Sequence, residues 1–171
     1  MEKHPLHKAV GKLLKEFAEK NNLEARLDPA CDAKSKQNIP LFCGPKAMVT
    51  RLCCVDAMLL QKDKVTVIIE IEVSNIKPTQ ICGKYLTTAL SNEYNHDEKS
   101  IKIEKNSIDF IQILDTSSPY KEEQFKNIKE AMEKIHSCGC VKNHHIIGID
   151  WKNKKDINEL KKQLHKHLTQ I

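Results

Sequence analysis

The fold is decided by residues 51–74, which read RLCCVDAMLLQKDKVTVIIEIEVS. This pattern predicts strands over 51–60 and 65–74 joined by a tight polar turn, because the second run is rich in β-branched residues. Side chains alternate between the two faces of a strand, so Glu70 and Glu72 lie on one face within the most apolar run of the chain. Asp56 lies in the neighbouring strand, so three carboxylates are expected close together.

Carboxylates in such an apolar setting need a partner. Burying them is unfavourable unless they are paired or bind a metal ion. Three acidic groups close together also repel, so at least one of them is expected to keep its proton until a cation arrives. Mg²⁺ and Mn²⁺ prefer a few carboxylates together with water and phosphate oxygens. The alternative is an ordinary alternating strand whose glutamates lie on a solvated face and pair with lysines.

The composition is that of a single domain spanning residues 1–171, with 40% hydrophobic and 30% charged residues. No apolar run approaches the length of a membrane span, and the first residues lack the apolar segment of a secretion signal, so we expect a cytoplasmic protein. The cysteine count is odd, and Cys53 and Cys54 fall in a predicted buried strand, which favours reduced thiols over a disulfide framework. The net charge of +5 is compatible with a polyanionic partner.

The remaining elements follow from the spacing of apolar residues. Near-continuous apolar character over 107–115 predicts a strand buried on both faces. Residues 28–50 contain three prolines and predict a long irregular segment, which is a candidate for contact with DNA or with a second copy. Residues 95–107 predict an edge strand or a loop. Strands are also expected over 23–27 and 144–151, and helices over 5–22, from Pro78 through Leu90, over 119–136 and over 156–171.

Strands thus come first as a meander and then alternate with helices. This order predicts an α/β protein with a mixed central sheet flanked by helices on both faces, in which 65–74 and 107–115 are the central strands.

With this order of elements, residues 51–90 resemble the PD-(D/E)xK nuclease superfamily, whose restriction endonuclease-like fold has an αβββαβ core. Asp56 matches the aspartate of the second strand, and Glu70 matches the acidic residue of the third strand. Glu72 departs from the family pattern because it occupies the lysine position, although some family members carry glutamate there and are active. In other members the lysine has moved to the following helix, which makes Lys84 a candidate and Lys77, in the preceding turn, a further one.

The resemblance implies a Mg²⁺- or Mn²⁺-dependent endonuclease that hydrolyses DNA in restriction or repair. Two copies related by a two-fold axis could cut both strands of a duplex, so we expect a homodimer. Asp56 and Glu70 would hold the metal, Glu72 would be a further ligand or orient the attacking water, and Lys84 would stabilise negative charge on the phosphate. Gln80 on the helix after the third strand and Glu16 on the first helix are further candidates. For Lys84, Gln80 and Glu16 the alternative is an ordinary polar residue on a helix surface.

Two other functions stay open at this stage. The first is a nuclease-fold protein that binds nucleic acid or a protein partner without cutting. The second is a small α/β domain with no role in nucleic-acid chemistry.

A second group of chemically active residues lies between 136 and 145, and it could suggest zinc. The Cys138–Cys140 pair is, however, closer in sequence than zinc ligands usually are, and His144 and His145 face opposite sides of a strand. The pattern therefore argues against a zinc site and favours a turn at Gly139, and no spacing supports a cysteine nucleophile beside a histidine base. The zinc ligands considered are His136, Cys138, Cys140 and His144.

Overall fold

The computed structural model describes residues 4–73, 77–96, 99–117, 119–132, 138–151 and 156–169. Its helices are α1 (Pro5–Lys20), α2 (Pro78–Ala89), α3 (Pro119–Met132) and α4 (Asp156–Leu168), with one turn of 3-10 helix over Met48–Thr50. Its strands are β1 (Glu24–Leu27), β2 (Ile39–Phe42), β3 (Arg51–Val55), β4 (Ala57–Gln61), β5 (Lys64–Glu72), β6 (Glu93–His96), β7 (Lys99–Lys102), β8 (Ile108–Asp115) and β9 (Val141–Ile149).

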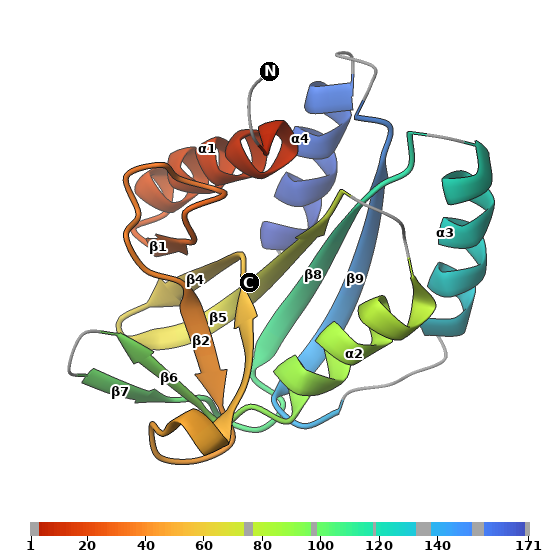
Figure 1. Cartoon of the computed structure of the whole chain (residues 1–171). Coiled ribbons are helices and arrows are strands. Elements are labelled where there is room, and N and C mark those ends of the chain that lie inside the picture. The colour runs from red at the N-terminus through yellow and green to blue at the C-terminus, as the bar shows by residue number, and fades with distance from the viewer. Residues whose placement is uncertain are drawn as a thin grey trace.

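The main sheet has five strands in the order β1-β4-β5-β8-β9. Strands β5, β8 and β9 run parallel to one another, whereas β1, β4 and β5 pair in antiparallel fashion. Helices α1 and α4 cover one face, and α2 and α3 cover the other (Figure 1). The predicted α/β architecture is therefore confirmed, with a mixed sheet, helices on both faces and β5 at its centre.

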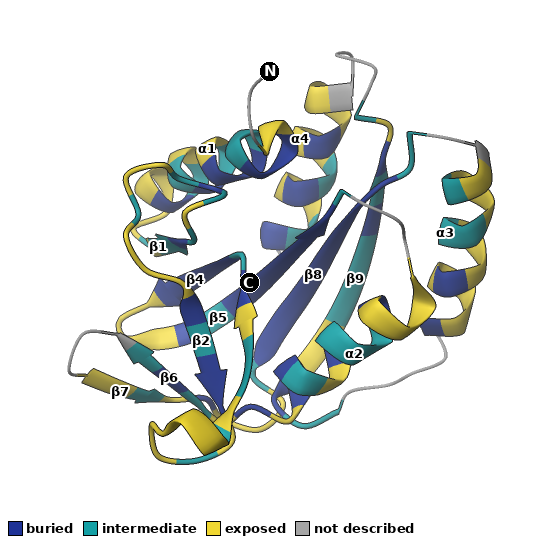
Figure 2. Cartoon of the chain, in the orientation of Figure 1, coloured by how far each residue is buried: buried dark blue, intermediate teal, exposed yellow. Residues whose placement is uncertain are grey.

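Two hydrophobic cores form because side chains alternate along the strands. Val67, Ile69 and Ile71 of β5 pack with α1 and α4, whereas Ile68 packs with α2 and α3. Strand β8 is buried along its whole length, as its continuous apolar character predicts (Figure 2). Glu70 and Glu72 alternate with Ile69 and Ile71 and so belong to the α2 face.

A second sheet, in the order β3-β2-β6-β7, corrects two predictions. Residues 28–38 are irregular as expected, but the prediction is wrong for Ile39–Phe42, which form β2 between β3 and β6. The single strand predicted over 51–60 is also wrong, because the chain leaves the second sheet at Val55 and enters the main sheet at Ala57. Asp56 lies at this crossing, where its carbonyl oxygen accepts the Asp28 N–H at 2.9 Å. The change of sheet depends on partners distant in sequence, so the local pattern does not reveal it.

Other boundaries move by a few residues. Helix α2 ends at Ala89, and the β6–β7 hairpin that follows confirms a strand within 95–107. Strand β9 begins at Val141, ahead of the predicted residue 144. The predicted helical residues 133–136 and 170–171, and Ser74 of the predicted strand, lie outside the described residues.

Two further observations concern membranes and thiols. Within the described ranges, none of the helices combines the length and the apolar character that crossing a bilayer requires. All seven cysteines lie in described segments, and all are free.

The contact between α1 and the 28–38 segment depends on Gly11. A Cβ atom at this position would lie 2.4 Å from the carbonyl oxygen of Cys31, which is backbone and cannot move easily. We expect Gly11→Ala to lower the free energy of unfolding by about 1–3 kcal/mol. Gly83→Ala is the matched control, because nothing lies within 4 Å of its Cβ and alanine favours a helix interior. Urea denaturation that shows equal effects of the two substitutions would contradict this packing.

Candidate active site at the end of the central strands

Three carboxylates meet at one end of the main sheet because of its register. Leu27 of β1 pairs with Ala57 of β4, and Ala57 pairs with Ile69 of β5. The residues that come next in these antiparallel ladders are Asp28, Asp56 and Glu70. The sheet therefore aligns three acidic residues from segments far apart in the sequence.

Glu70 is the most buried of these acids, with 3% of its surface exposed. One carboxylate oxygen, Oε2, lies 2.7 Å from the Nζ atom of Lys84. The other, Oε1, is buried and has no hydrogen-bond partner among the described residues. Burial first, and then the charge of Asp56, raise the pKa of Glu70 to about 8, against the opposing effect of Lys84. When protonated, Glu70 can donate a hydrogen bond to Asp56, and when ionised its Oε1 atom can accept a cation.

Asp56 is fixed beside Glu70 by the backbone of β5. Its Oδ2 atom accepts the Ile71 N–H at 2.6 Å, so the side chain takes the place that a strand carbonyl would otherwise fill. The sequence places Asp56 inside a strand, whereas the structure places it between two strands. This position lets its carboxylate approach the end of β5.

Helix α2 provides the cation and the amide that face the glutamates. Lys84 lies 4.0 Å from Glu72 Oε2 in addition to its contact with Glu70, and Gln80 Nε2 donates to Glu72 Oε2 at 2.5 Å. Burial alone would lower the pKa of Lys84, but the surrounding carboxylates outweigh it and raise that pKa. Glu72 is 7% exposed, so the alternative of two solvated glutamates is wrong. Lys77 is exposed just before α2 begins.

Sequence reasoning missed His7. This residue is buried on α1, and its Nδ1 atom has no hydrogen-bond partner within the described ranges. Burial lowers its pKa, while the nearby carboxylates of Asp56 and Asp28 oppose that shift. The available signal was a histidine beside Leu6 on the apolar stripe of α1, but such a histidine is ordinarily only part of a core. Asp28 was also missed, because it was interpreted only as the end of a strand.

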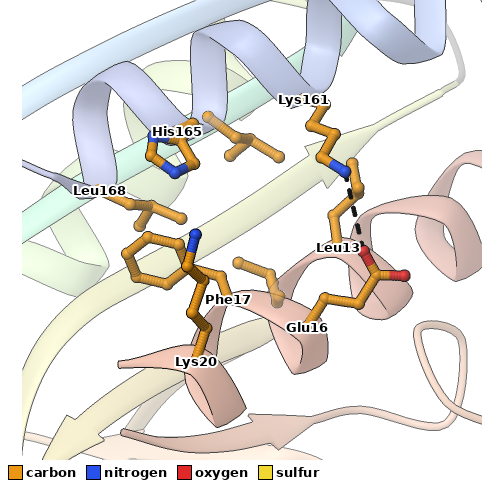
Figure 3. A pocket seen from close by; sticks show the side chains of 9 residues that line it. Leu13, Glu16, Phe17, Lys20, Lys161, His165 and Leu168 are labelled. Carbon is orange, nitrogen blue, oxygen red and sulfur yellow. Dashed lines mark ion pairs between the residues drawn. The ribbon is translucent and has the colours of Figure 1, made fainter. Parts of the chain in front are cut away.

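Glu16 lies elsewhere. It is half-exposed on α1 and faces Lys161 of α4 at 4.0 Å, beside a pocket with an apolar floor between these two helices (Figure 3). The structure therefore brings Asp56, Glu70, Glu72, Gln80 and Lys84 together and leaves Glu16 outside this group.

The described side chains include no group of three His, Cys, Asp or Glu residues placed to hold a metal ion. At the acidic end of the sheet, Glu72 contacts Gln80 and Lys84. Asp28 accepts the N–H groups of Ala30 and Cys31, so Asp56 and Glu70 are the two acids that remain for a cation. Of the zinc ligands considered, Cys140 donates its thiol to the Thr88 carbonyl and His144 contacts Gln112, while His136 lies outside the described residues. Burial raises the pKa of Cys140 to about 12, so it is no nucleophile at neutral pH.

The fold and the site together define an α/β protein in which buried Glu70, half-buried Asp56 and Lys84 lie together at the end of the central strands. Comparison with protein-family models, with curated proteins and with solved structures found no significant match to this chain. The site must therefore be interpreted from its own chemistry.

The pKa of Glu70 predicts how stability depends on pH. Because this pKa is higher in the folded chain than in the unfolded one, the folded protein keeps a proton that the unfolded chain has lost, and stability must fall as pH rises through about 8. Glu70→Gln removes this titration. The unfolding free energy of the wild type relative to this variant should fall by roughly 4 kcal/mol between about pH 5 and pH 9. Histidines with lowered pKa titrate in both proteins and cancel. If the unfolding free energies of the wild type and the variant instead change with pH in parallel, Glu70 is ionised throughout this range.

Proposed function

We propose that this protein is a metal-dependent endonuclease with a restriction endonuclease-like fold, and that it hydrolyses phosphodiester bonds in DNA. The observation that carries the proposal is buried Glu70 beside half-buried Asp56, with Lys84 at 2.7 Å from one oxygen of Glu70 and no hydrogen-bond partner on the other among the described residues. A buried acid with an unsatisfied oxygen costs stability and is retained where it has a chemical role.

The residues present fit a hard cation. Asp56 and Glu70 supply carboxylate oxygens, which Mg²⁺ and Mn²⁺ prefer, and the free Oε1 of Glu70 is a vacant donor. A bound ion of this kind would polarise the phosphate and lower the pKa of a water molecule. Lys84 would hold the negative charge that develops on the phosphate, and Gln80 keeps Glu72 oriented. The buried imidazole of His7 can take a proton beside the carboxylates.

A basic hairpin next to the site supports DNA as the substrate. Residues 33–55 contain no acidic residue, and they carry Lys34, Lys36, Lys46 and Arg51. Strand β3 leads from Arg51 directly to Asp56, a distance of about 17 Å along an extended strand, or roughly five base pairs of duplex. Two apolar side chains at the tip, Met48 and Val49, are 85% and 92% exposed. Such side chains can wedge between base pairs beside phosphate-binding cations.

Removing the charges of this hairpin should weaken DNA binding. We expect the double substitution Lys46→Gln and Arg51→Gln to lower the affinity for duplex DNA and to reduce the slope of log affinity against log salt concentration by about 2. The control replaces the same number of charged residues, Lys62 in the β4–β5 turn and Lys64 at the start of β5. Fluorescence anisotropy at several salt concentrations, with Ca²⁺ present, measures both slopes. Equal losses in the two double variants would exclude a specific role for the hairpin.

The proposal itself is tested by incubating the wild-type protein with Mg²⁺ or Mn²⁺ and supercoiled, linear, single-stranded or branched DNA. Metal-dependent cleavage is the expected result, and two copies related by a two-fold axis would cut both strands of a duplex. The second candidate is a protein that binds DNA without cutting it, and it is favoured by the contacts that hold Glu72 away from Asp56. Salt-sensitive binding without cleavage under either metal would support that candidate, and the absence of both would exclude the two.

A further inference from the structure

A second cluster of ionisable side chains lies at the edge of the main sheet formed by β9. A partly open pocket of about 450 Å³ lies there between β9, α3 and α4, and we call it the β9-edge pocket. Its ionisable lining comes from all three elements. These side chains are Lys129 of α3, His144 and His145 of β9, and Glu159, Lys162, Lys166 and His167 of α4.

Positive charge dominates this pocket. Lys162 and Lys166 are exposed, and neither makes an ion pair within the described part of the chain. The lining acid, Glu159, accepts a hydrogen bond from the side chain of Gln163 at 3.1 Å. Asp109 of β8 lies close enough to affect the histidines and accepts from Asn143 at 2.6 Å. Both acids thus accept hydrogen bonds from amide side chains, and Lys162 and Lys166 are left for an anion.

Two histidines stack against each other in the same pocket. The rings of His145 and His167 have centroids 4.1 Å apart at an interplanar angle of 30°, and His167 Nδ1 is buried without a partner among the described residues. Burial lowers the pKa of both; for His167 the charges of His145, Lys166 and Lys129 lower it further, while Asp109 opposes the shift. An anion bound among the lysines would raise the pKa of both histidines and so favour their protonated form.

His144 does not join this pair. Its Nε2 atom lies 2.9 Å from Gln112 Oε1, and its ring stacks on Phe110. Burial and, to a smaller extent, His145 lower its pKa to about 4, so it remains neutral near pH 7. The groups in the pocket that can respond to an anion are therefore the two stacked histidines and the lysines.

We propose that the β9-edge pocket binds a phosphate group, received by Lys162 and Lys166, and that His145 and His167 take up protons when it binds. Several cations converging on one pocket suit a phosphate, which presents several charged oxygens, better than a single carboxylate. The source of the phosphate is either a free phosphate monoester or the backbone of a nucleic acid. This inference is independent of the proposed nuclease site, because none of its residues takes part in it.

The test is a titration of the full chain with inorganic phosphate, AMP and a short DNA duplex at about pH 6.5 and pH 8. We expect calorimetry to show tighter binding of inorganic phosphate at the lower pH, with proton uptake seen as a dependence on the buffer. Side-chain NMR signals of His145 and His167 should shift, and those of His144 should not. The double substitution Lys162→Gln and Lys166→Gln should weaken binding at least tenfold.

The control removes two lysines outside the pocket, Lys12 and Lys161, the second of which faces Glu16 between α1 and α4 (Figure 3). The variant His167→Asn should bind inorganic phosphate as the wild type does at pH 8, but its affinity should not increase at pH 6.5. A response to inorganic phosphate and AMP alone assigns the pocket to phosphate monoesters, and one that includes the duplex assigns it to backbone phosphate as well. No response of either histidine to 20 mM phosphate, or equal weakening in the control, would overturn the proposal.

Discussion

Glu70→Gln is expected to lower the rate of metal-dependent DNA cleavage by about 10²–10³-fold, because it removes the carboxylate that would hold the cation. The substitution keeps the shape of the side chain and can accept a hydrogen bond from Lys84, so the fold should be retained. In the wild type, 10 mM Mn²⁺ should raise the melting temperature by on the order of 3 °C through mass action, assuming a millimolar dissociation constant. Glu70→Gln should abolish this rise.

Glu123→Gln, an exposed substitution on α3, is the matched control and should change neither measurement. The rise in melting temperature tests whether Glu70 holds a metal ion, and the cleavage rate tests whether Glu70 takes part in DNA hydrolysis. A metal response that disappears while the wild type cuts no DNA would keep the metal site and exclude the nuclease. Cleavage that survives Glu70→Gln would place the chemistry elsewhere in the chain.

Lys84→Met should lower the cleavage rate by a similar factor, but for a different physical reason. The amine would act on charge that develops on the phosphate, so its removal should lower the cleavage rate by about 10²-fold, whereas the metal-induced rise in melting temperature should persist. Without metal, the variant leaves the Glu70 carboxylate buried without its cation. We expect a loss of about 3 kcal/mol of stability above pH 8, and a smaller loss at pH 6, where Glu70 keeps its proton.

The comparison for Lys84 is Lys126→Met. Lys126 pairs with Glu122 at 3.6 Å on the surface of α3, where an ion pair contributes little to stability. Chemical denaturation at the two pH values compares the stability of both variants, and cleavage assays compare their activity. If Lys84→Met and Lys126→Met behave alike, the contact between Lys84 and Glu70 has no special role.

Most of the main sheet could be predicted because its elements have strong local periodicity. Helix α1 has an apolar stripe, β5 has a β-branched run, and β8 has a continuous apolar run. Together these patterns indicate which side chains are buried, and they imply a sheet covered on both sides. Strands β2 and β6 could not be found in the same way. Each has four residues, and each exists because it pairs with segments far away in sequence.

The candidate site also combines features that local spacing predicts with features that depend on tertiary contacts. The sequence by itself determined that Glu70 and Glu72 share one face of an apolar strand and that a helix carrying Gln80 and Lys84 follows, because both statements depend only on local spacing. Only the tertiary structure decided that the chain changes sheets at Asp56, that Asp28 and His7 join it, and that Glu72 turns to α2. Strand register and helix packing set these relations, and both depend on pairing between residues distant in the chain, which local periodicity does not encode.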